Sequence, residues 1–251
     1  MTPIRAIACD LFNTLVRIEP DLYPTVLWNG ETRLCSAPIL LDLLLPWCPD
    51  LEPERFVRSS INVQDELEIE RRVHHREISS QERFRRTLAR AGIDTEKDDG
   101  RLLRAVLKLH ADTLIAATQL SPRALYVLSE LARRFPVVLV SNFDDGVVCR
   151  RLLRERGILP YLKSALISEE LGWRKPQREV FVRAAREGGC AREAMLFVGD
   201  SPIDDIDGAR AAGMQPVWIP GPVEPPPDWR EPELRVSSLE ELLVLPCLSK
   251  E

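Results

Sequence analysis

The side chains in this 251-residue chain that could do chemistry follow short apolar runs. Asp10 ends the run IRAIACD, Ser141 and Asn142 end PVVLVSN, and Asp200 ends AMLFVGD. Asp205 comes five residues after Asp200, across the start of a predicted helix. Hard divalent ions such as Mg²⁺ prefer carboxylate oxygens, so Asp200 and Asp205 can both face a cation held against Asp10.

A reactive carboxylate such as Asp10 usually works with a proton-transfer partner close by. The residue two positions on, where such a partner would sit, is Phe12, which can neither give nor accept a proton. Lys175, in the stretch GWRKP, offers a positive charge, although a lysine at the start of a helix is ordinarily a solvated surface residue. The sequence therefore presents a reactive carboxylate without an evident proton-transfer partner.

The three apolar runs fit strands that are buried on both faces of a parallel sheet, because they are short, rich in Val, Ile and Leu, and alternate little. Helical patterns lie between them, as in SPRALYVLSELARRF, where Ser121 is the expected cap. This order predicts an α/β doubly wound fold. Ligands bind beyond the carboxyl ends of such strands, so the polar residues that end the runs should meet at one edge.

Residues 17–119 show few strand signals and many helical patterns. In SSQERFRRTLARAG, Ser79 or Ser80 is the expected cap and Gly92 the expected end. We therefore predict two domains, an α/β core formed by residues 1–16 and 120–251 and a helical cap over residues 17–119. The proline-rich stretch after Ile219 is expected to be surface loop.

Composition excludes several classes of protein. The net charge of −5 argues against a nucleic-acid binder, and no apolar run reaches the roughly 18 residues that a membrane span needs. The N-terminus enters a strand pattern directly, so we expect no signal peptide. The six cysteines are scattered without a CxxC pair, which indicates reduced thiols in a cytoplasmic protein. A monomer or homodimer is expected.

Taken in order, these clusters resemble the motifs of the haloacid dehalogenase (HAD) superfamily, subfamily I with a C1 helical cap. DLFNT is similar to motif I, VSN to motif II, Lys175 in GWRKP to motif III and GDSPIDD to motif IV. ARAAGMQPVWI also looks like the stretch that follows motif IV. The resemblance covers essentially the whole chain and implies a Rossmann-like core with an inserted cap.

The resemblance implies a magnesium-dependent phosphatase that acts on a small phosphorylated substrate. Asp10 would attack phosphorus and become an aspartyl-phosphate. Mg²⁺ would sit between Asp10, the backbone carbonyl of Phe12 and Asp205, with Asp200 nearby.

The remaining matches imply roles in holding the phosphoryl group. Lys175 would neutralise charge on the nucleophile and on the transferring group. Ser141 and the backbone N–H of Asn142 would hydrogen-bond phosphoryl oxygens, and Thr14 would hold the turn of motif I.

Phe12 departs from the phosphatases of this family, which have a second aspartate there to protonate the leaving group and later activate water. General acid–base help contributes typically about 10²–10⁴-fold, so its loss should affect poor leaving groups most. The three histidines all lie in the predicted cap, and Asp144 and Asp145 are expected to be residues of a helix start.

Three branches of the superfamily tolerate a non-acid at this position. L-2-haloacid dehalogenases have an aromatic residue there, but they need no Mg²⁺ and lack the Gly-Asp pair of VGD. Phosphonatase-type enzymes use a cap lysine, and the cap here offers Lys97 and Lys108, both expected at the surface. VSNFDD, GWRKP and VGD most resemble the REG-2-like branch.

Two main hypotheses follow, with a 2-haloacid dehalogenase-like hydrolase as a further alternative. The first is a HAD-like hydrolase that uses Mg²⁺ and a small phosphorylated metabolite. The second is a non-catalytic HAD-fold protein that binds a phosphorylated ligand or a protein partner. Within the cap, Arg71, Arg72 and Arg76 are candidates for contacting an anionic substrate tail, although a solvated helix face is the simpler expectation.

Overall fold

The computed structural model describes residues 2–97 and 99–248. The chain divides into two compact units: a core unit of residues 1–17 and 119–251, and an insert unit of residues 18–118. The chain passes between them in two short strands, β2 (Val16–Ile18) and β5 (Thr118–Leu120), which pair with each other.

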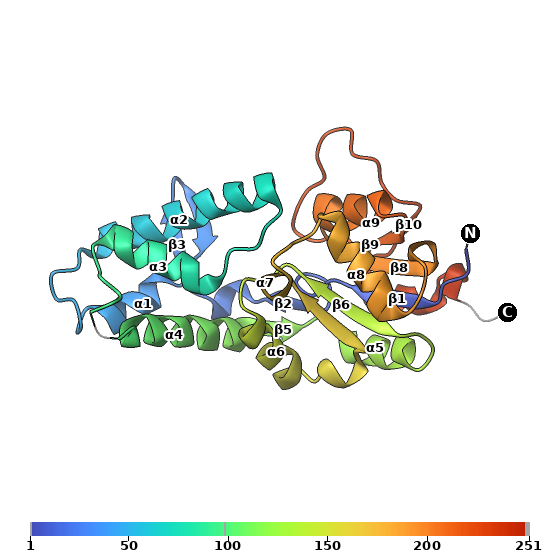
Figure 1. The fold of residues 1–251 in the computed structure, drawn as a ribbon, viewed down its shortest axis with the longest axis horizontal. Helices are drawn as coiled ribbons and strands as arrows, with labels where there is room; N and C mark the ends of the chain where they lie inside the picture. Colours follow the sequence, from blue (N-terminus) through green and yellow to red (C-terminus); the bar gives the residue numbers. More distant parts are fainter. Residues whose placement is uncertain (1, 98, 249–251) are drawn as a thin grey trace. The chain divides into compact units, whose positions relative to one another are not determined.

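The core unit is built on a six-stranded sheet in the order β10-β9-β8-β1-β6-β7 (Figure 1). All neighbouring strands of this sheet are parallel. The strands are β1 (Ala6–Cys9), β6 (Val137–Ser141), β7 (Ser164–Ile167), β8 (Met195–Gly199), β9 (Gln215–Trp218) and β10 (Leu234–Arg235). The prediction of an α/β fold with a parallel sheet is confirmed.

The three central strands account for the apolar runs in the sequence. Every residue of β1, β6 and β8 is buried, because helices cover both faces of the sheet. Cys9, the last residue of β1, lies opposite Leu139 of β6 and Val198 of β8. The residues that follow these strands are thereby brought to one edge.

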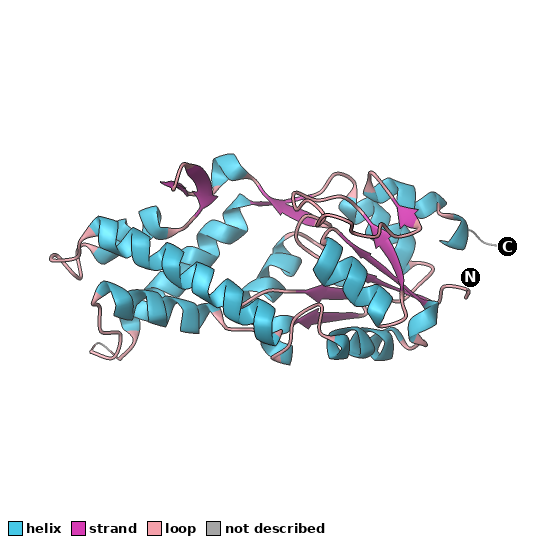
Figure 2. Cartoon of the chain, turned by 90° about the horizontal axis from the view of Figure 1, so that it is seen from above, coloured by secondary structure: helices cyan, strands magenta, loops and turns pink. Residues whose placement is uncertain are grey.

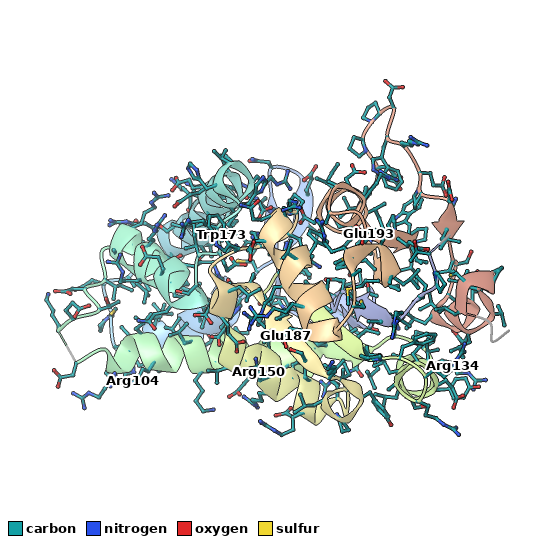
Figure 3. The ribbon with its side chains drawn as sticks, turned by 45° about the vertical axis from the view of Figure 1, so that its right-hand side comes forward. Arg104, Arg134, Arg150, Trp173, Glu187 and Glu193 are labelled. Carbon is teal, nitrogen blue, oxygen red and sulfur yellow. The ribbon has the colours of Figure 1, made fainter. Side chains whose placement is uncertain are left out.

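Helices α8 and α9 pack on one face of the sheet, where Phe181 of α8 meets Phe197 of β8 with ring centroids 5.1 Å apart. Figure 1 shows α5 and α6 on the opposite side. Arg150 of α6, labelled in Figure 3, forms a 2.6 Å ion pair with Glu170 of α7. The helices are α5 (Ala124–Ala132), α6 (Gly146–Glu155), α7 (Ser168–Leu171), α8 (Arg178–Gly188) and α9 (Gly208–Ala211).

Short helical turns complete the core unit. A π-helical turn, η4 (Pro202–Asp207), leads into α9. The other turns are η2 (Leu159–Tyr161), η3 (Arg192–Ala194), η5 (Leu239–Val244) and η6 (Pro246–Leu248). The expected cap at Ser121 was wrong: α5 begins after Arg123, whose φ of 59° sets the turn without a side-chain cap. β10 follows the proline-rich stretch and was not predicted by the sequence analysis.

The insert unit is mostly helical, with α1 (Ala37–Leu44), α2 (Pro53–His74), α3 (Ser80–Ala91) and α4 (Arg101–Ala117) (Figure 2). As predicted, Ser79 caps α3 by accepting a 3.2 Å hydrogen bond from the Glu82 N–H, and Gly92 ends it with a φ of 89°. No helix within residues 2–97 and 99–248 is both long enough and apolar enough to span a bilayer.

The sequence analysis missed a hairpin in this unit. After the turn η1 (Pro20–Leu22), β3 (Thr25–Trp28) pairs antiparallel with β4 (Glu31–Leu34). Asn29 and Gly30 join the strands with φ values of 50° and 85°, so the Asn-Gly pair was a hairpin signal in the sequence.

Candidate active site

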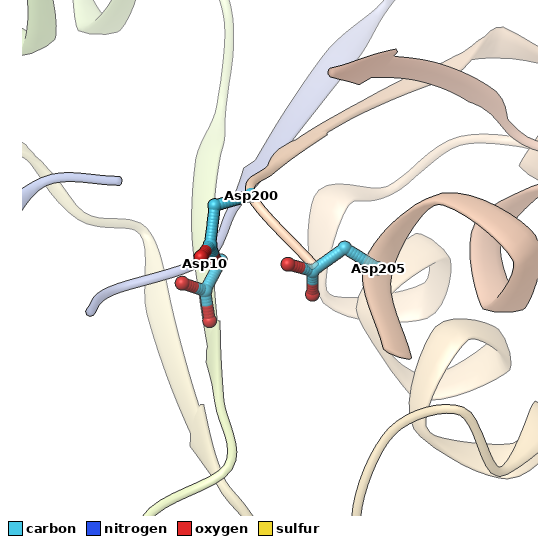
Figure 4. A group of neighbouring side chains, drawn as sticks. All are labelled: Asp10, Asp200 and Asp205. Atoms are coloured by element: carbon cyan, nitrogen blue, oxygen red, sulfur yellow. The ribbon is translucent and has the colours of Figure 1, made fainter. Parts of the chain in front are cut away.

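Three carboxylates meet at the carboxyl edge of the sheet (Figure 4). Asp10 follows β1, Asp200 follows β8 and Asp205 lies in η4. Each offers an oxygen within 4.8 Å of the others, and all three residues are buried. Burial of three like charges is costly unless positive charge accompanies them.

Lys175 provides one of the required positive charges. Its Nζ lies 2.6 Å from Asp10 Oδ1, 2.7 Å from Asp205 Oδ1 and 2.9 Å from the Val140 carbonyl oxygen. Only 2% of the residue is exposed, so it is not the solvated helix-start lysine that its type would favour. Burial alone lowers the pKa of Lys175, but the charges of Asp10 and Asp205 outweigh it and hold the pKa above its usual value.

The cluster retains unbalanced negative charge. Three ionised carboxylates and one ammonium leave two negative charges uncompensated. Burial, with further contributions from neighbouring carboxylates, raises the pKa of Asp10 to about 6 and that of Asp200 to about 7. Asp205 Oδ1 is buried and, within the described residues, its contact is the ion pair with Lys175 rather than a hydrogen bond. Hard oxygen donors with this charge deficit fit a divalent cation.

Backbone geometry holds Asp205 against the sheet. A Cβ on Gly199 would lie 2.4 Å from the Asp205 carboxyl carbon, so glycine is required where the carboxylate crosses the end of β8. The Ser201 N–H donates a 3.0 Å hydrogen bond to Asp205 Oδ2. The glycine of VGD is therefore explained by the approach of a carboxylate.

Asp200 is positioned by residues that the sequence analysis missed. The Trp218 indole N–H donates a 2.9 Å hydrogen bond to the Asp200 carbonyl oxygen, and the Asn13 side chain hydrogen-bonds its carboxylate. A Cβ on Gly221 would lie 2.2 Å from Asp200 Oδ2. Only the strand-like PVWIP pattern hinted at Trp218, and nothing in the proline-rich stretch indicated Gly221.

Asn142 has a side-chain role that was not predicted. Its Oδ1 accepts a 2.8 Å hydrogen bond from the Lys175 N–H, and its Nδ2 donates to the Lys175 carbonyl oxygen at 3.0 Å. The same Nδ2 lies 3.3 Å from Asp204 Oδ2. The amide thus fixes the backbone of the buried lysine from both sides, while the proposed contact of the Asn142 N–H with a phosphoryl group stays a prediction.

Ser141 and Thr14 are both buried in the core unit. Ser141 ends β6, next to β1, and its contact with a phosphoryl oxygen stays a prediction. The Thr14 hydroxyl has no hydrogen-bond partner among the described residues, and its expected role in holding the motif I turn stays a prediction. Backbone bonds hold this turn, including Asn13 N–H to Val16 O at 2.6 Å.

Phe12 stacks on Phe143, with ring centroids 5.4 Å apart and ring planes within 6° of parallel. Its carbonyl as a cation ligand stays a prediction. Asp145 is the N-cap of α6, accepting a 3.0 Å hydrogen bond from the Val148 N–H, which is the structural role expected for it.

Two of the three arginines of the insert unit proposed for substrate contact, Arg71 and Arg72, form local ion pairs. Arg71 is buried, with a 2.9 Å ion pair to Glu77. Arg72 pairs with Glu68 four residues away, as expected for a solvated helix face. Lys108 is 78% exposed at its side chain, in agreement with its expected surface position.

The fold and this site define a hydrolase of the haloacid dehalogenase type. A sequence model of the haloacid dehalogenase-like hydrolase family matches residues 4–213, and the chain belongs to that family.

Relatives within the family carry different names. The phosphoserine phosphatase of Thermus thermophilus is 35% identical over 51% of this chain, and the match spans about half (52%) of that relative's length. The glyceraldehyde 3-phosphate phosphatase of Methanopyrus kandleri is 28% identical over 91% of this chain and 94% of its own. A 2-haloacid dehalogenase from Pseudomonas syringae shares the fold with a TM-score of 0.73 and 25% identity, covering 95% of this chain and 96% of that one.

Proposed function

We propose that the protein is a Mg²⁺-dependent phosphatase that acts on a small phosphorylated metabolite through Asp10. The observation that carries the proposal is the buried cluster in which Lys175 bridges Asp10 and Asp205 while two negative charges remain uncompensated. The phosphatase names of two relatives support the same chemistry.

The geometry supports a nucleophilic role for Asp10. Lys175 holds one oxygen of its carboxylate, which leaves the other oxygen for attack on phosphorus. Asp10, Asp200 and Asp205 would hold Mg²⁺, which when bound would offset repulsion between the nucleophile and an anionic phosphoryl group. Lys175 would stabilise negative charge as it develops in the transition state.

Phe12 restricts the substrates that this site can use. A phosphate monoester of an alcohol needs a proton on its leaving oxygen, and the stacked ring of Phe12 supplies none. An acyl phosphate or a phenolic ester releases a weak base and needs no such help. We therefore expect activity on activated phosphates to exceed activity on alkyl phosphates.

The test is hydrolysis of acetyl phosphate and p-nitrophenyl phosphate, with Mg²⁺ and with EDTA. Wild type should be active only with Mg²⁺, and Asp10→Asn should be inactive. Asp145→Asn is the matched control, because asparagine also caps helices well and activity should be retained. If wild type hydrolyses neither substrate, the proposal fails and a non-catalytic protein that binds a phosphorylated ligand is favoured.

The aromatic pair at Phe12 and Phe143 favours one second candidate, displacement of halide from a 2-haloacid. Halide leaves without a proton, and the Pseudomonas syringae neighbour is named a 2-haloacid dehalogenase. The uncompensated carboxylates argue for the phosphatase. Chloride release from 2-chloropropionate in EDTA would reverse that preference. A cytoplasmic location and a monomeric or homodimeric state stay predictions.

A further inference from the structure

Phe12, two residues after Asp10, stacks on Phe143, whose backbone is fixed by hydrogen bonds. Phe143 is 9% exposed, and Ser168, which is buried at the start of α7, fixes its backbone. The Phe143 N–H donates to Ser168 Oγ at 2.8 Å, and the same hydroxyl donates to the Phe143 carbonyl oxygen at 3.2 Å. Phe12 stacks nearly parallel on this ring, so the position two residues after Asp10, where a proton-transfer group was sought, carries a fixed apolar ring.

Three charged groups near this edge, on Lys175, Asp145 and Asp204, already have other partners. The Lys175 ammonium lies within 2.9 Å of Asp10, Asp205 and the Val140 carbonyl oxygen. The carboxylate of Asp145 caps α6. That of Asp204 lies 3.3 Å from the Asn142 amide, which also binds the backbone of Lys175. None of these groups is placed as a ready base for water.

We propose that Asp10 forms a long-lived phosphoenzyme that exchanges its phosphoryl group with carboxylates faster than it loses it to water. The inference rests on the proposed nucleophilic role of Asp10 and adds a second activity, phosphoryl transfer between acyl phosphates and carboxylate acceptors.

Each transfer balances without a proton. An Asp10 oxygen forms a bond to phosphorus while the bond from phosphorus to the acyl oxygen breaks, and the electron pair leaves on a carboxylate. In the return step an acceptor carboxylate attacks phosphorus and the electron pair returns to Asp10. Water as the acceptor must lose a proton during attack, and the missing base slows that step by about 10²–10⁴-fold.

The first measurement follows the phosphoenzyme directly. Wild type with Mg²⁺ is mixed with [³²P]acetyl phosphate, quenched in acid, and examined for protein-bound label that hydroxylamine releases. After a chase with unlabelled acetyl phosphate, the label should be replaced while the total phosphoenzyme persists. After removal of all small molecules, it should decay slowly in water. Asp10→Asn should take up no label.

Two substitutions at one position isolate the proton-transfer step. Phe12→Asp should shorten the lifetime of the label in water by about 10²–10⁴-fold. Phe12→Asn has nearly the same size and polarity but no base, so its label should persist much longer than that of Phe12→Asp. If the two variants decay at the same rate, opening of the apolar surface rather than proton transfer controls the lifetime, and the inference is overturned.

The second measurement is exchange of [¹⁴C]acetate into acetyl phosphate. Exchange by wild type should be faster than net hydrolysis, whereas hydrolysis should dominate in Phe12→Asp. Rapid hydrolysis by wild type without exchange or label would overturn the inference and leave the phosphatase proposal standing. Absence of label, exchange and hydrolysis together would refute both.

Discussion

Replacing Asp200 with asparagine should stabilise the metal-free protein at neutral and alkaline pH. Burial and the charges of Asp10 and Asp205 raise the pKa of Asp200 from 3.8 to about 7, so ionisation of this residue opposes folding. Asparagine removes the charge and keeps the size. Size matters here because the Cβ position of Gly221 lies 2.2 Å from Asp200 Oδ2.

The magnitude follows from linkage between protonation and folding. The folded state binds the Asp200 proton more tightly than the unfolded state, so the destabilising contribution grows as pH rises from about 4 and is complete above about 7. At about 1.4 kcal/mol per pH unit of difference, the gain from Asp200→Asn is about 4 kcal/mol at pH 8 and about 2 kcal/mol at pH 5. Relaxation around the site reduces both values.

Urea unfolding in EDTA at pH 5 and pH 8 measures this gain. Addition of Mg²⁺ should shrink the gain at pH 8, because a cation at 100 times its Kd stabilises wild type by about 2.7 kcal/mol and the variant loses a ligand. Asp145→Asn serves as control and should change stability by less than about 1 kcal/mol. The reasoning fails if Asp200→Asn is less stable than wild type in EDTA at pH 8, or if its effect is equal at both pH values.

Three further predictions concern other contacts. Asn142→Ala removes both hydrogen bonds to the Lys175 backbone and should lower kcat at least tenfold. It should also lower the free energy of unfolding, measured in urea, by about 1–3 kcal/mol. An unchanged kcat would contradict this prediction. Gly199→Ala should displace the Asp205 carboxylate and weaken Mg²⁺ binding in calorimetry, which unaltered affinity would disprove. Arg71→Met should destabilise the protein by about 3–5 kcal/mol because it leaves Glu77 buried without its partner, and KM for anionic substrates should not rise.

The apolar runs carried most of what the sequence could predict about the core. β1, β6 and β8 are buried on both faces, so their apolar composition alone was enough to predict them as strands. Parallel pairing of these strands then places Asp10 and Asp200 at a common edge. β10 has only two residues and carries no comparable pattern. Its pairing depends on β9, which supplies the neighbouring backbone.

The contacts that support the site could not be predicted from the sequence, for a different reason. The Asn142 side chain binds the backbone of Lys175, which lies 33 positions away in the sequence. Gly221 leaves room for the Asp200 carboxylate, and no pattern of residues indicates such a steric requirement. Lys175 was predicted from resemblance, since its residue type and position alone favoured exposure. The stacking of Phe12 on Phe143 likewise needed coordinates, although both residues follow predicted strands.

The place of β1 at the centre of the sheet has a consequence for how the molecule is made. β1 is synthesised first, yet its neighbours β6 and β8 begin only at Val137 and Met195. During synthesis, β1 therefore has no partner strand until more than half of these 251 residues have been made. Helical contacts within residues 18–118 are local and form quickly, whereas closing the sheet is slow. We infer that the nucleophile is the first part of the site to be made and among the last to be buried.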